Sequence, residues 1–180
     1  MKFIVLLGLL INIIIAFYIS KHSFNIKNIK NSLIIFLGHW IIFLVLPIAQ
    51  TLGIITAPLI LKHPFAIQIF GIIIFLTGLL ITVFGRVSLR DNYANGTTPE
   101  IITDQKLVTN GIYSYTRNPI YLGKLLFFVG FELSLNSWLL ILIVPIAIAF
   151  HRAILKEEKL LTQAFSQEFS VYKSKTRRYL

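Results

Sequence analysis

The sequence predicts an all-α integral membrane protein with about five transmembrane helices. Of its 180 residues, 56% are hydrophobic and only 13% are charged, a balance that is not expected of a water-soluble globular protein. The apolar residues are gathered in long blocks, each near or above the roughly 20 residues that a membrane-spanning helix needs. These blocks cover residues 3–19, 33–61, 65–84 and 119–150.

The first three blocks predict one helix each. Block 3–19 is expected to be a retained helix, because its apolar run is longer than the core of a secretion signal and no Ala-x-Ala-like cleavage site follows it. Block 33–61 exceeds one span, so Pro47 and Pro58 are expected to mark a kink and a terminal bend. Together these helices form an N-terminal three-helix membrane part, residues 1–84.

The fourth block is too long for one helix, and the polar residues within 131–137 predict a turn at its midpoint. We therefore expect short helices near 119–133 and 137–155, forming a tight hairpin. The hairpin belongs to the second part of one folded domain, residues 85–180, which also contains a polar loop and a C-terminal helix.

The basic residues predict the orientation in the membrane. Every lysine and arginine except Lys2 and Lys62 lies in loop 20–32, in loop 85–118 with its helix junctions, or in the C-terminal tail. The positive-inside rule places these segments in the cytoplasm and the N-terminus outside. The same asymmetry explains the net charge of +10 without a nucleic-acid partner. The chain has no cysteine, which excludes disulfides, thiolate metal sites and a cysteine nucleophile.

The polar loop contains the first candidate site. Gly111 permits a tight turn, and Asn118-Pro119 is typical of a helix N-cap followed by the first helical residue. Arg117 beside the free N–H groups of that helix start would form a small anion site at membrane depth. The alternative is an ordinary cap next to an arginine whose charge extends to the membrane surface.

The tail predicts a single helix that runs out of the membrane. At about 100° per residue, Glu157 and Glu158 fall on the edges of its apolar face. Two carboxylates directed into the protein need a cationic partner, since burying an unpaired charge is costly. That partner is either Arg117, in a structural role, or the ammonium of a ligand. The apolar face consists of Ile154, Leu161, Phe165, Phe169 and Tyr172, and Arg152, Lys156 and Lys159 lie opposite.

Two motifs follow each other along the second half of the chain. The first, Leu-Val-x-x-Gly-x-Tyr-x-x-x-Arg-x-Pro-x-Tyr, runs from Leu107 to Tyr121. The second, Glu-Glu-x-x-Leu-x-x-x-Phe-x-x-x-Phe-x-x-Tyr, runs from Glu157 to Tyr172. In order and spacing they resemble the isoprenylcysteine carboxyl methyltransferase family and its phospholipid methyltransferase relatives, over roughly residues 85–178.

The resemblance implies a membrane-embedded enzyme that binds S-adenosylmethionine on the cytosolic side, between the loop and the C-terminal helix. Glu157 would take the methionine ammonium, and Arg117 and Asn118 are the other candidate catalytic residues. The family usually has His where this chain has Asn118, which keeps hydrogen-bonding capacity but has no titratable ring. The cofactor-binding residues implied are Gln105, Lys106, Leu107, Val108, Gly111, Tyr113, Asn118, Pro119, Tyr121, Glu157 and Glu158.

The resemblance also implies a lipid or lipidated acceptor that enters from the bilayer, and no metal. We expect isoprenylcysteine-type carboxyl O-methylation first, for which a carboxylate is already a nucleophile. Phospholipid N-methylation is the alternative, and an amine must lose a proton before it attacks. A non-catalytic membrane protein that binds lipid is the competing hypothesis. The sequence leaves the acceptor and the oligomeric state open.

Overall fold

The computed structural model describes residues 41–58, 64–89 and 106–179, together with residues 7, 8, 10, 11 and 14. Within these residues every regular element is a helix, and the β contacts are two isolated bridges. The prediction of an all-helical fold is confirmed for this part of the chain. Most of block 3–19 and the loop 20–32 lie outside the described residues, so the number of spans stays a prediction.

Within the described residues 41–58, the second apolar block forms a helix that changes from π to α geometry. A π-helical turn, η2 (Ile41–Val45), leads directly into α3 (Leu46–Thr51). Pro47 lies in the first turn of α3, and its missing N–H removes a helical hydrogen bond where the π-helical turn meets α3. The chain then leaves the helix through Gly53, whose φ of 77° is in the left-handed region. The helix thus ends at Thr51, before Pro58, where the sequence predicts the terminal bend.

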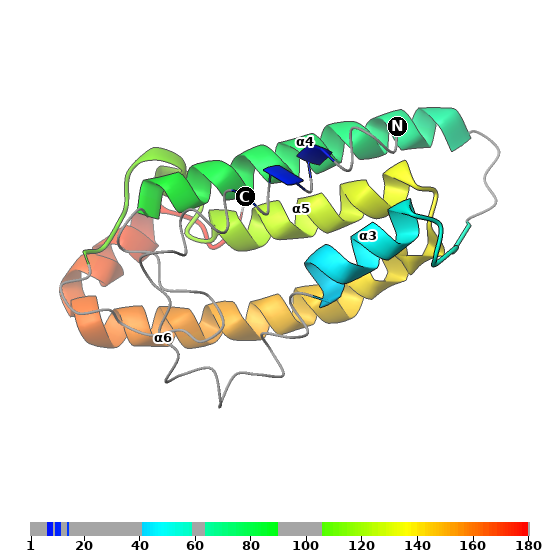
Figure 1. The fold of residues 1–180 in the computed structure, drawn as a ribbon. Helices are drawn as coiled ribbons and strands as arrows, with labels where there is room; N and C mark the ends of the chain where they lie inside the picture. The colour runs from blue at the N-terminus through cyan, green and yellow to red at the C-terminus, as the bar shows by residue number, and fades with distance from the viewer. Residues whose placement is uncertain are drawn as a thin grey trace.

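Helices α4 (Pro64–Leu89) and α5 (Pro119–Ser134) pack side by side along most of their length (Figure 1). Glycines allow their backbones to touch. A Cβ on Gly78 would lie 2.6 Å from the carbonyl oxygen of Gly123, and a Cβ on Gly130 would lie 2.6 Å from that of Gly71. Such close contact between small residues is a common way to pack helices in a membrane, where no hydrophobic force acts between them. We call these four glycines the glycine seam.

Aromatic side chains fill the space around the glycine seam. The core cluster consists of Phe75 and Leu79 from α4 with Phe127 and Phe131 from α5. The ring centroids of Phe75 and Phe127 are 4.6 Å apart. This packing fixes the register of α4 against α5, and with it the position of the α5 N-terminus.

A turn at residues 135–137 connects α5 to the rest of the C-terminal half. Asn136 has a φ of 50°, a conformation that asparagine tolerates better than most residues. A 3-10 turn, η5 (Trp138–Leu142), follows and continues into α6 (Ile143–Lys175). In Figure 1, α6 runs back along α5 in the opposite direction. The predicted turn is confirmed, while a hairpin that crosses the bilayer stays a prediction.

The C-terminal helix is not the single straight helix that the sequence predicts. Ser166 has φ 33° and ψ −99°, so the helical conformation is broken there. After this break the last helical residues turn back toward the start of α5 (Figure 1). We call residues 167–175 the return helix. The prediction failed because no Gly or Pro marks the break in the sequence.

Among the described residues, two helices are long and apolar enough to cross a membrane, namely α4 and the combined η5–α6 helix from Trp138 to Lys175. Large apolar side chains such as Phe65, Phe84 and Ile141 are exposed on them. The apolar part of α6 ends near Phe150, and charged residues continue the helix beyond it. These features indicate that the protein associates with a membrane.

Candidate active site

The loop before α5 is held in a compact turn. Gly111 opens the 3-10 turn η4 (Gly111–Ser114) with a φ of 60°, as the predicted tight turn requires. A Cβ at this position would lie 3.3 Å from the hydroxyl oxygen of Ser88, near the end of α4. The turn therefore rests against α4 and buries Tyr113.

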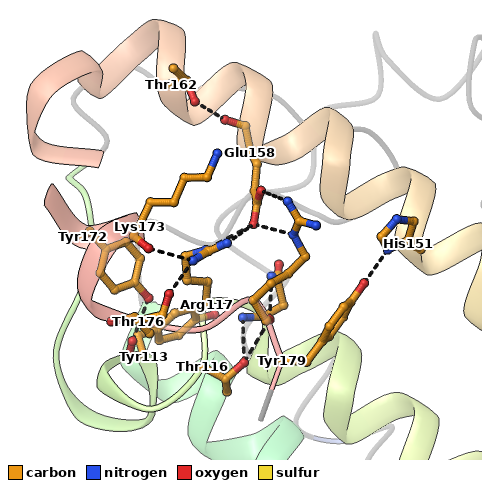
Figure 2. Close-up of polar contacts among 12 residues, drawn as sticks. Tyr113, Thr116, Arg117, His151, Glu158, Thr162, Tyr172, Lys173, Thr176 and Tyr179 are labelled. Carbon is orange, nitrogen blue, oxygen red and sulfur yellow. Dashed lines mark hydrogen bonds and ion pairs between the residues drawn. The ribbon is translucent and has the colours of Figure 1, made fainter. Parts of the chain in front are cut away.

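The return helix packs against this turn. Phe169 and Tyr172 are buried, with 1% and 7% of their surface exposed. The hydroxyl of Tyr172 donates a hydrogen bond of 2.6 Å to the carbonyl oxygen of Tyr113 (Figure 2). Burial raises the pKa of Tyr172 to about 12, so the phenol stays a neutral donor at physiological pH. The break at Ser166 thus brings the end of α6 onto the loop.

The last described residues, 176–179, lie beside residues 116–118, and we call them the C-terminal segment. The backbone N–H of Arg117 donates to the carbonyl oxygen of Arg177 at 2.9 Å, within an isolated parallel bridge. The carbonyl oxygen of Arg178 accepts from the Asn118 side chain at 3.0 Å and from the Thr116 hydroxyl at 3.2 Å. These bonds join the chain end to the start of α5.

An ion cluster of Arg117, Glu158 and Arg178 also stabilises the contact between the C-terminal segment and the start of α5 (Figure 2). Nε and Nη2 of Arg117 donate to Oε1 of Glu158 at 3.1 and 3.0 Å. Arg178 donates to the two carboxylate oxygens at 3.1 and 2.8 Å. The remaining terminal nitrogen of Arg117 donates to the carbonyl oxygens of Lys173 and Thr176. One carboxylate therefore connects α6, the α5 start and the C-terminal segment.

The surroundings of Glu158 favour its charged form. Burial raises the pKa of this carboxyl group, but hydrogen bonds from Arg178 and Arg117 and their positive charges outweigh the burial and lower the pKa below its ordinary value. Of the two partners that the sequence left open for the buried acids, Arg117 is the partner of Glu158. The expectation that Arg117 extends to the membrane surface is wrong, since its side chain is 8% exposed.

Helix α5 begins at Pro119, as predicted. Asn118 holds the N-cap position, but its side chain makes no capping hydrogen bond. It donates instead to the carbonyl oxygen of Arg178, so the predicted N-cap position is confirmed while the side chain serves another contact. Because Arg117 directs its donors to Glu158 and to backbone carbonyls, the predicted anion site at this helix start lacks a free guanidinium.

Glu157 has different surroundings from its neighbour. It is half-buried, and its Oε2 accepts a hydrogen bond of 3.2 Å from the hydroxyl of Tyr121 on α5. Its charge also interacts favourably with that of Lys124, one turn further along α5. This contact joins the two motifs across 36 residues of sequence.

The structure brings most of the candidate residues to one end of α5. Arg117, Asn118, Pro119, Tyr121, Glu157 and Glu158 lie around its first turn, and Tyr113 lies under the return helix. Leu107 and Val108 are half-buried in the approach to η4, whereas Lys106 and Gly111 are exposed. Gln105 lies outside the described residues. Whether these side chains bind a cofactor stays a prediction.

Several residues of this region were not predicted. Thr116 and Arg178 hold the C-terminal segment, Lys124 places positive charge beside Glu157, and Arg86 lies near Lys124. Arg178 looked like one of many basic residues of the tail, and Arg86 and Lys124 like membrane-flanking charges. For Arg86 and Lys124 the sequence held one signal. Each follows a glycine, Gly85 or Gly123, in a helix that packs closely against another.

Comparison with known proteins agrees with the two motifs. A search of curated proteins finds no match. A family model described as phospholipid methyltransferase matches residues 66–168, which is more than half of the chain and includes most of α4, all of α5 and most of α6. The chain belongs to the phospholipid methyltransferase family.

Proposed function

We propose that the protein is an S-adenosylmethionine-dependent methyltransferase that acts on a lipid or lipidated acceptor in the membrane. The family membership supports a methyltransferase of lipids. The observation that carries the proposal is the contact between Tyr121 and Glu157, which unites both motifs at the start of α5. The first candidate reaction is isoprenylcysteine-type carboxyl O-methylation.

In this proposal the two adjacent glutamates have different roles, one structural and one in ligand binding. Glu158 accepts four hydrogen bonds from two arginines, so it serves as the brace of the site. Glu157 accepts one from Tyr121 and keeps carboxylate capacity for a cationic ligand. A half-buried carboxylate of this kind fits the ammonium group of the cofactor's methionine part. When bound, S-adenosylmethionine supplies a methyl group activated by a sulfonium.

The protein's own residues would contribute mainly by positioning. The ion cluster and the C-terminal segment fix the α5 start, and the return helix covers Tyr113. A carboxylate acceptor needs no general base, so holding it in line and excluding water is sufficient. Phospholipid N-methylation is the second candidate, favoured by the description of the family. It needs a base for the amine proton.

The test is a calorimetric titration of the detergent-purified full chain with S-adenosylhomocysteine. We expect saturable binding, and a loss of at least about tenfold in affinity in Glu157→Gln, which keeps the shape but removes the charge. Glu168→Gln is the matched control, because Glu168 is exposed on the return helix. Unchanged binding in Glu157→Gln would remove Glu157 from the site. No binding by folded wild type would favour a non-catalytic lipid-binding protein.

A further inference from the structure

Arg86 on α4 is a buried cation without a full set of acceptors. The residue is 6% exposed, and its Nε has no hydrogen-bond partner among the residues that the structure describes. The guanidinium remains charged at any physiological pH. A buried charge without a counter-charge is costly, so this position calls for an anion.

A second cation lies next to it. Arg86 follows Thr82 by one turn of α4, and a Cβ on Gly123 of α5 would lie 2.7 Å from the backbone nitrogen of Thr82. Lys124 follows Gly123, is half-buried, and its charge interacts with those of Arg86 and Glu157. Both ion pairs in the described part of the chain belong to Glu158, so neither Arg86 nor Lys124 has one there.

The charges around this point do not balance. Arg86 contributes a permanent positive charge, with Lys124 as a second donor beside it, and the proposed function assigns the negative charge of Glu157 to the cofactor ammonium. The positive charge of Arg86 is then left without a counter-charge at the junction of α4 and α5, where burial strengthens its attraction for an anion. A single anionic group of a ligand would restore neutrality.

We propose that Arg86 and Lys124 form the subsite that binds the singly charged oxyanion of the acceptor lipid. A carboxylate and a phosphodiester share this chemistry, and the guanidinium matches either with two parallel N–H donors. Lys124 follows Tyr121 by about one turn of α5, and its charge interacts with that of Glu157, so the subsite would hold the acceptor headgroup beside the cofactor. The inference rests on the proposed function and names the part of the substrate that this site recognises.

The experiment measures lipid binding to the full chain in detergent without cofactor. One probe pair is N-acetyl-S-farnesylcysteine and its neutral methyl ester, and the other is dioleoylphosphatidylethanolamine and neutral dioleoylglycerol. We expect wild type to bind the oxyanion member of one pair about tenfold or more tightly than its neutral partner, as expected for a charge-assisted contact. Which pair shows the preference identifies a carboxylate or a phosphodiester as the ligand.

Arg86→Gln should bring that ratio close to one while S-adenosylhomocysteine affinity stays within about twofold of wild type. Arg152→Gln is the matched control, because Arg152 is an exposed arginine of α6, and it should keep the ratio. If Arg86→Gln does not fold, the lipid ratio alone is measured in Lys124→Gln, which should also bring it close to one.

Two results would overturn the inference. A loss of cofactor affinity in Arg86→Gln with lipid preference intact would assign the cations to the cofactor carboxylate. Equal affinity of wild type for the charged and neutral probes would show that Arg86 and Lys124 do not bind the oxyanion of a lipid. Failure of the proposed function looks different, because wild type would then fail to bind S-adenosylhomocysteine whatever its lipid preference.

Discussion

Glu158 holds three segments of the candidate site in place through its ion pairs, without a contact to a ligand being required of it. Its carboxylate meets two guanidiniums, one from the α5 start and one from the C-terminal segment. Removing only the carboxylate charge leaves two arginines facing each other. Arg117 is 8% exposed and Arg178 31%, so solvent screens the second arginine more than the first.

We expect Glu158→Gln to lower the free energy of unfolding by about 2 to 3 kcal/mol, below the full cost of breaking a fully buried pair. Thermal unfolding in detergent measures the effect, with Glu168→Gln as the exposed control. The lowered pKa of Glu158 adds a pH signature. The charge stabilises the fold above the ordinary glutamate pKa of about 4.3, and this stability is lost as the pH falls through the folded pKa. Wild type and variant should therefore converge in acid, and a difference that persists there would contradict an ionic origin.

A second buried acid lies at the opposite end of α5. Glu132 is fully buried, and its Oε2 accepts a hydrogen bond of 3.0 Å from Nε2 of Gln50 on α3. The same nitrogen donates to the hydroxyl of Ser137 at 3.1 Å. This polar contact joins α3 to the turn after α5.

Glu132→Gln keeps an acceptor for Gln50 and should change the free energy of unfolding by less than about 1 kcal/mol. Glu132→Leu removes one of the two acceptors of the buried Gln50 amide and should cost about 1 to 3 kcal/mol. Thermal unfolding of both variants distinguishes them, and Glu168→Leu controls for the loss of a carboxylate at an exposed position. Equal stability of the two Glu132 variants would mean that the contact with Gln50 contributes little.

At the scale of elements, the glycine seam determines how α4 presents Arg86 to α5. A Cβ on Gly78 would meet backbone atoms of residues 123, 126 and 127, which cannot rotate away as a side chain can. The helices would have to separate to accept any larger residue.

We expect Gly78→Val to destabilise the protein by about 3 kcal/mol or more, because the clash is with backbone. Thermal unfolding and S-adenosylhomocysteine titration measure the loss of packing and of the site. Ala66→Val enlarges an exposed residue of the same helix and should behave like wild type. A stable Gly78→Val protein would show that α4 and α5 can pack at a greater distance.

At the scale of the whole molecule, features set by neighbouring residues could be predicted from the sequence, whereas contacts between residues far apart in the sequence could not. The turn at 135–137 and the α5 start at Pro119 depend on neighbouring residues, and both were found from local patterns. The break at Ser166 has no local signal. The pairing of Arg178 with Glu158 spans a fold-back that helical periodicity cannot reveal. The sequence indicated that buried acids need partners, but only the three-dimensional arrangement identifies Arg178 as one of them.

The predicted orientation in the membrane can be tested because exposed residues lie near each of the two ends of α5. Pro58 forms a bridge with Ser137, so the segment after α3 lies at the end of α5 that is far from Arg117 and the C-terminal segment. The chain has no cysteine, so single cysteines report the side of the membrane without background. If basic segments stay in the cytoplasm, a membrane-impermeant maleimide should label Ile54→Cys in intact cells and Ser174→Cys only after permeabilisation. Both positions are exposed. The opposite pattern would place the candidate site outside the cell, where a cytosolic cofactor could not reach it, and would contradict the proposed function together with the orientation.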